Sequence, residues 1–192
     1  MNHRLPYEPA MDIPSALTSD ECAALFKWAC ALRRDSPHAP IVEIGTAQGR
    51  SALVMAHAPG GFVVCVDDWG EHVNYRGQRF HHSFERFERN LDRLGMRDRV
   101  SIRRGLSVDV AVRWPPAVGI AMLFIDGDHS QKGVQDDWMA WSPHLKPGAI
   151  VAFHDYTLPG AGVRNMVDGL VMGGDLSHIE LVDSLAITSF RE

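Results

Sequence analysis

Four short apolar runs, each followed by glycine, aspartate or histidine, constrain the fold of this chain more than any other feature. They cover 41–44, 62–66, 121–125 and 149–153 and are rich in valine and isoleucine. Such near-continuous runs are typical of strands buried on both faces of a parallel sheet. Helical patterns separate them, so the sequence predicts a three-layer α/β fold. Ligands of such sheets bind outside the carboxyl ends of the strands.

Periodicity and capping signals predict the other elements. Thr18 and Glu21 have the spacing of a capping box, which predicts a helix that runs to about Arg34. Trp138 and Trp141 lie on one helical stripe, so we expect them in the core. The remaining patterns predict helices over 50–57, 83–94, 108–112, 131–142 and 163–172, and strands over 100–104 and, as a closing pair, over 178–190.

Two segments lack a clear period. Residues 1–16, which contain three prolines, predict an irregular N-terminal arm. Segment 70–82 is predicted to be a lid or acceptor loop, and a solvated loop is the alternative. Its candidate contacts to an anionic or hydroxylated acceptor are Arg76, Arg79, His81 and His82.

Length and charge limit the classes of protein. The 192 residues fit one domain, 1–192, at roughly 100–200 residues per domain. The net charge of −5 argues against nucleic acid or an anionic membrane as a partner, and no apolar run approaches the roughly 18 residues that cross a bilayer. Three cysteines without C-x-x-C spacing predict reduced thiols in a cytoplasmic protein. A monomer and a homo-oligomer both stay open.

A glycine turn follows the first strand. Gly45 and Gly49 have the wrong spacing for a pyrophosphate fingerprint, and a tight strand-to-helix turn explains them equally well. Asp67 or Asp68 lies about 20 residues further on, where an acid can accept both hydroxyls of a ribose. Together these features predict an adenosine-containing cofactor.

Two neighbouring strands end in clusters of acids and imidazoles. Asp126, Asp128 and His129 follow one strand, and His154 and Asp155 follow the next. Adjacent strands lie about 4.8 Å apart, so side chains from both ends can meet one divalent ion. The alternative is helix capping by the first two aspartates, with a solvated Asp155.

The glycine turn over 41–49 resembles motif I of the class I S-adenosylmethionine-dependent methyltransferases. Segments 123–130 and 145–156 resemble the bacterial sugar and antibiotic O-methyltransferases (methyltransferase family 24). The resemblance covers 18–190 and implies a Rossmann-like sheet of seven strands, the last antiparallel. It implies that the cofactor contacts Glu43, Gly45, Thr46, Gly49, Asp67, Asp68, Gly105, Leu106, Ser107 and Asp126.

The resemblance also implies a divalent metal on Asp126, His154 and Asp155. His154 stands where a carboxylate is commoner; Mg²⁺ or Mn²⁺ is expected, and Fe²⁺ or Zn²⁺ stays open because imidazole suits them. Relatives place a base at the position of Asp128 or His129. We favour His129, since a carboxylate beside a cation becomes a poorer base.

The expected reaction is methyl transfer from S-adenosylmethionine to a hydroxyl of a small molecule: a sugar, a phenol or a natural-product intermediate. A divalent metal is expected to assist by lowering the pKa of the acceptor hydroxyl. The alternatives are metal-independent N- or O-methylation, or a non-catalytic subunit that only binds S-adenosylmethionine.

Overall fold

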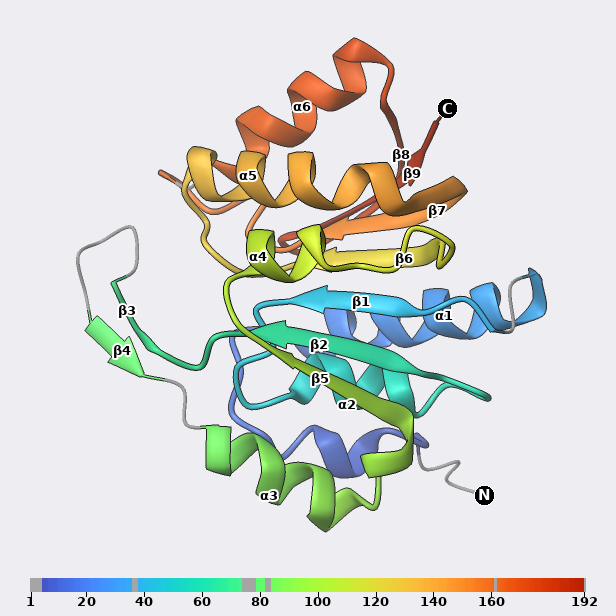
Figure 1. The fold of residues 1–192 in the computed structure, drawn as a ribbon, viewed down its shortest axis with the longest axis vertical. Coiled ribbons are helices and arrows are strands. Elements are labelled where there is room, and N and C mark those ends of the chain that lie inside the picture. The colour runs from blue at the N-terminus through green and yellow to red at the C-terminus, as the bar shows by residue number, and fades with distance from the viewer. Residues whose placement is uncertain (1–4, 36–37, 74–78, 82–83, 161, 192) are drawn as a thin grey trace.

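Seven strands form one central sheet in the order β5-β2-β1-β6-β7-β9-β8 (Figure 1). The computed structural model describes residues 5–35, 38–73, 79–81, 84–160 and 162–191. The strands of this sheet are β1 (Ile41–Ile44), β2 (Val63–Asp67), β5 (Val100–Arg104), β6 (Ile120–Ile125), β7 (Leu145–Phe153), β8 (Leu176–Val182) and β9 (Leu185–Phe190). The helices are α1 (Ser19–Asp35), α2 (Arg50–Ala56), α3 (Phe84–Leu94), α4 (Ser107–Val112), α5 (Gln131–Trp141) and α6 (Val163–Gly173).

Burial on both faces explains why the central strands pair in parallel. Every residue of β1 and of β6 is buried, and β1 pairs in parallel with β2 on one side and β6 on the other. β9 lies between β7 and β8 and is antiparallel to both. The sheet that the resemblance implied is therefore confirmed.

Helices pack on both faces and complete the three layers. α1, α2 and α3 share one apolar cluster with Ile41 of β1, whereas α4, α5 and α6 share the other with Val42. This alternation follows the two-residue period of a strand. Trp138 and Trp141 are buried in the second cluster, as predicted.

The N-terminal arm is more ordered than its prolines suggested. A short 3-10 helix, η1 (Glu8–Ala10), lies within it, and Ile13 is buried in the core. The Arg50 side chain donates hydrogen bonds to the carbonyl oxygens of Met11, Ile13 and Leu17. α2 therefore fixes the arm beside the carboxyl ends of the central strands. Two further 3-10 helices, η2 (Arg97–Arg99) and η3 (Ser142–His144), precede β5 and β7.

The segment predicted as a lid forms a second, small sheet. β3 (Glu71–Val73) and β4 (Arg79–His81) pair antiparallel and project from the body of the protein (Figure 1). Arg76 and His82 lie outside the described residues. Within the described part of the chain, no helix is both long and apolar enough to span a membrane.

Candidate active site

A cavity of about 720 Å³ opens at the carboxyl ends of the central strands. That volume lies within the range of small-molecule and cofactor sites. The glycine turn, the β2 end, the β5–α4 turn and the ends of β6 and β7 all line it, together with Pro14 to Leu17 of the arm. The lining includes every side chain predicted for the cofactor, the metal and the base except Glu43.

The glycine turn passes very close to its neighbours. Gly45 has φ +86°, and a Cβ there would overlap the backbone carbonyl of Asp126. Gly49 has φ +91°, and its Cβ would lie 2.7 Å from the Phe87 ring. Both positions favour glycine by conformation and by space. The tight turn left open above is therefore present, and it forms one wall of the cavity.

Two buried polar atoms at this turn have no hydrogen-bond partner among the described residues. Glu43 is fully buried on β1, and among the described residues neither its Oε1 nor the Thr46 hydroxyl has a hydrogen-bond partner. Burial raises the pKa of Glu43 to about 8. Buried polar atoms usually pair, and Thr46 lines the cavity, so its hydroxyl is placed to bond a ligand there.

Asp67 ties the glycine turn to β2. Its Oδ2 accepts from the Ala47 amide at 2.8 Å and its Oδ1 from the Trp69 amide at 2.6 Å. Each carboxylate oxygen can accept a second hydrogen bond, so a ribose diol fits this acid. The neighbouring Asp68 also lines the cavity, but its Oδ1 accepts from the Gly70 amide in its own turn.

The turn between β5 and α4 forms another wall. Gly105, Leu106 and Ser107 line the cavity, and the Ser107 hydroxyl accepts from the Trp141 indole at 2.8 Å. Asp137 of α5 also lines it, and burial raises its pKa to about 6. Sequence reasoning missed Asp137. Its signal was an acid on the buried face of a predicted helix.

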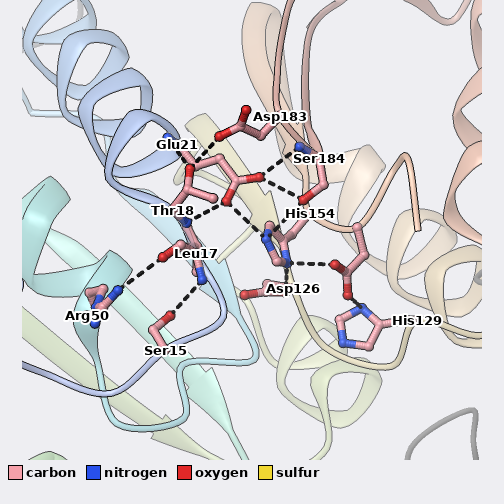
Figure 2. A network of polar contacts seen from close by, with 11 residues as sticks. Ser15, Leu17, Thr18, Glu21, Arg50, Asp126, His129, His154, Asp183 and Ser184 are labelled. Atoms are coloured by element: carbon pink, nitrogen blue, oxygen red, sulfur yellow. Dashed lines mark hydrogen bonds and ion pairs between the residues drawn. The ribbon is translucent and has the colours of Figure 1, made fainter.

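His154 lies buried at the centre of an acidic cluster (Figure 2). Its Nδ1 is 3.0 Å from Asp126 Oδ1 and 3.4 Å from Asp155 Oδ1. Its Nε2 is 3.4 Å from Glu21 Oε2 and 3.3 Å from the Ser184 hydroxyl. Burial acts to lower the pKa of His154, but the acids Asp126, Glu21 and Asp155 outweigh it and raise that pKa to about 11.

Glu21 comes to this cluster from the start of α1. The capping box is confirmed, because the Thr18 amide donates to Glu21 Oε2 at 2.8 Å and the Glu21 amide donates to the Thr18 hydroxyl at 3.1 Å. The Ser184 amide and hydroxyl both donate to the other Glu21 oxygen. Burial acts to raise the pKa of Glu21, but the bonds from His154, Thr18 and Ser184 hold it at about 2. The contact to His154 could not be read from the sequence.

Asp155 also contacts His129. The distance from His129 Nδ1 to Asp155 Oδ2 is 3.2 Å, and both side chains are only partly exposed at the cavity. A ring nitrogen that faces a carboxylate carries the proton, which leaves Nε2 of a neutral imidazole as the basic atom. Asp155 has φ +59°, a left-handed conformation that is uncommon for a residue with a side chain. This backbone conformation accompanies the close pairing of the two residues.

Asp128 does not cap α5 itself but holds the residue that does. One of its oxygens accepts from the Ser130 amide and the other from the Ser130 hydroxyl, both at 2.9 Å. Ser130 in turn caps α5 by accepting from the Gly133 amide. Asp126 and Asp155, in contrast, contact imidazoles rather than a helix start. Of the two base candidates, Asp128 has both oxygens engaged by Ser130, whereas His129 is held through Nδ1 by the Asp155 carboxylate.

The side chains predicted for a metal meet, but their donor set does not fit a divalent cation. Asp126 and Asp155 both contact His154, whose two ring nitrogens each face a carboxylate. A metal ligand must present a lone pair from a neutral ring. Among the described residues, no group of three or more His, Cys, Asp and Glu side chains is arranged to hold a metal ion.

Solved structures share this fold. The O-methyltransferase TomG from Streptomyces achromogenes, in complex with SAM, is 21% identical, with a TM-score of 0.67 over 98% of this chain and 87% of that one. The O-methyltransferase from Bacillus cereus, in complex with SAH, is 17% identical, with a TM-score of 0.65 over 100% and 93%. The O-methyltransferase NovP is 15% identical, with a TM-score of 0.76 over 93% and 82%. At these identities the likeness establishes the fold.

The sequence profile of a family described as a methyltransferase domain, methyltransferase family 24, matches residues 42–156. The match covers more than half of the chain. It begins in β1 and ends just beyond Asp155, so it spans the glycine turn and both acidic strand ends. The chain therefore belongs to this family of methyltransferases.

Proposed function

We propose that this protein transfers the methyl group of S-adenosylmethionine to a hydroxyl of a small molecule, with His129 as the general base. The observation that carries the proposal is the contact between His129 and Asp155, which line the same cavity as the glycine turn and Asp67. The complexes of TomG with SAM and of the Bacillus cereus enzyme with SAH support the choice of methyl donor.

The chain offers a matching group for each part of this donor. Asp67 would accept from the ribose hydroxyls, and the turn from Gly45 to Gly49 would lie along the methionine portion. Thr46, within that turn, would offer its buried hydroxyl, and Glu43 lies buried in β1 just before the turn. Leu106 would lie beside the adenine, in the β5–α4 turn. When bound, the donor supplies an electrophilic methyl carbon whose bond to sulfur breaks with both electrons going to sulfur.

His129 would prepare the acceptor. A protonated hydroxyl is a poor nucleophile, and Nε2 of the ring would take its proton as the new oxygen–carbon bond forms. Asp155 would hold the ring through Nδ1 and stabilise the imidazolium that results. A positioned base of this kind contributes typically 10²–10⁴-fold to the rate. We propose no metal assistance, because His154 faces a carboxylate with each ring nitrogen and so does not offer a ligand to a divalent cation.

The acceptor class that we propose is a sugar, a phenol or a natural-product intermediate. The O-methyltransferase descriptions of TomG and NovP support a hydroxyl acceptor. Small hydroxylated compounds and their amine analogues, such as a phenol and the matching aniline, should be compared with purified protein. The measured quantity is S-adenosylhomocysteine released. Turnover confined to the hydroxyl compounds is expected; turnover confined to the amines would overturn the proposal in favour of N-methylation.

A further inference from the structure

The protonation state of His154 follows from the atoms around it. An ionised carboxylate carries no proton, so it can only accept hydrogen bonds. Asp126 and Asp155 face Nδ1, and Glu21 faces Nε2. The Ser184 hydroxyl gives its proton to Glu21, so toward His154 it can only accept. Both ring nitrogens therefore carry protons, and neither has a lone pair for a metal.

The charges in this cluster also need a cation. Three carboxylates converge on the buried His154 ring: Glu21 is buried, and Asp126 and Asp155 are only partly exposed. Buried carboxylates are costly unless a positive group pairs with them. His154 provides that group. Unlike a bound ion, it is part of the chain and directly follows β7.

Glu21 is held independently of the histidine. Thr18 and Ser184 together donate three hydrogen bonds to it, from the start of α1 and from the turn between β8 and β9. Glu21 therefore presents a fixed acceptor to Nε2 and sets the rotation of the His154 ring. That rotation directs Nδ1 to the acids of β6 and β7, and Asp155 then reaches His129 with its other oxygen.

From this geometry we infer that the His154 imidazolium, positioned by Glu21, occupies the place of the divalent cation between Asp126 and Asp155. The enzyme therefore works without a metal. The series of contacts from Glu21 through His154 and Asp155 to His129 holds the base in position. The inference deepens the proposed function and rests on it for the role of the base, whereas the cation replacement can be tested separately.

Metal binding tests the replacement without any turnover. Protein dialysed against chelator should be titrated with Mn²⁺ by calorimetry, as wild type and as His154→Asp, which places a fourth carboxylate beside Asp126 and Asp155. The wild type should bind no Mn²⁺ at this cluster, and His154→Asp should gain stoichiometric binding. Stoichiometric binding to the wild type that disappears in Asp126→Asn would overturn the inference.

A second variant guards against misfolding of the first. Four acids without a cation could unfold His154→Asp, so His154→Asp with Glu21→Gln removes one charge and should also gain Mn²⁺ binding. Glu21→Gln alone is the matched control and should gain none. A folded double variant that fails to bind Mn²⁺ would count against the replacement.

Turnover then distinguishes this inference from the proposed function. Wild-type activity on any accepted hydroxyl compound should be unchanged by chelator. Activity that chelator abolishes and Mn²⁺ restores would overturn the inference while leaving hydroxyl methylation intact. Absence of turnover on every acceptor would count against the proposed function, and the calorimetric result would still decide the role of His154.

Discussion

Two adjacent acids at the end of β2 accept hydrogen bonds from different parts of the fold. Asp67 bonds the glycine turn and its own strand end, and Asp68 Oδ1 accepts from the Gly70 amide in its own turn. Asp67 is therefore better placed to combine structural support with ribose binding.

Replacement of Asp67 should weaken cofactor binding more than replacement of its neighbour. Asp67→Asn keeps one oxygen acceptor but loses the charge, and a hydrogen bond to a charged group contributes roughly 1.5–3 kcal/mol. Calorimetry should therefore show a loss of S-adenosylmethionine affinity in this range. Asp68→Asn is the matched control, with little change expected. Equal affinities in both folded variants would remove Asp67 from the ribose role.

The buried carboxyl of Glu43 should make stability depend on pH. Its pKa is about 8 in the fold, against 4.5 for the free group. Between these values the folded state keeps a proton that the unfolded state releases. The stabilisation is therefore complete below about pH 4.5 and is lost as the pH rises through 8.

Glu43→Gln provides the comparison, because the amide does not ionise. Urea unfolding should be measured over this pH range for both proteins without ligand. The wild type should lose more free energy of unfolding with rising pH than the variant does. Asp137 changes stability in the same direction, but it is present in both proteins and cancels. Parallel curves would mean that Glu43 is ionised in the fold.

Asp155 should act on the rate through His129. Asp155→Asn keeps a group near Nδ1 but removes the charge that stabilises the imidazolium. We expect kcat to fall by at least tenfold, at about 1.4 kcal/mol per factor of ten, with unchanged affinity for S-adenosylmethionine. Single-turnover kinetics and calorimetry measure the two quantities. A normal kcat would show that His129 needs no orienting group.

At the scale of elements, the turn after β1 is the most sensitive connection. A Cβ at Gly45 meets the backbone at the end of β6, and backbone cannot move aside as a flexible side chain does. Gly60 also has positive φ, but nothing lies within 4 Å of its Cβ position. Comparing alanine substitutions at Gly45 and Gly60 therefore separates the cost of the backbone conformation from the cost of steric overlap.

Gly60→Ala should cost roughly 1–2 kcal/mol of stability, the cost of a left-handed conformation for a residue with a Cβ. Gly45→Ala should cost more, because it adds the overlap between β1 and β6, and it should also weaken cofactor binding. Thermal unfolding and calorimetry check both statements. Equal losses of stability would show that the strand ends can separate without penalty.

Local sequence signals predicted the helices and strands well, whereas contacts between residues distant in sequence could not be predicted. Apolar runs and the capping box placed the central strands and α1, because each signal lies within a few residues. The hairpin of β3 and β4 carried no alternating pattern. The contact between Glu21 and His154 joins the two halves of the chain, so neither residue's own neighbourhood indicated it.

At the scale of the whole molecule, the sheet brings cavity residues from 14–155 together at the carboxyl ends of its parallel strands. The parallel order of β5, β2, β1, β6 and β7 brings their carboxyl ends together around one cavity (Figure 1). The predicted cofactor residues and the predicted base meet there for that reason. The antiparallel pair of β8 and β9 adds Ser184, which holds Glu21.

The most direct test of this account is the turnover of His129→Ala beside that of Asp128→Ala, measured on one hydroxyl acceptor with chelator present. His129→Ala should lose about 10²–10⁴-fold in kcat with unchanged S-adenosylmethionine affinity. Asp128→Ala should keep its kcat and lose about 1 kcal/mol of stability with its hydrogen bonds to Ser130. Near-normal turnover of His129→Ala together with loss of turnover in Asp128→Ala would contradict the account and make the carboxylate the base.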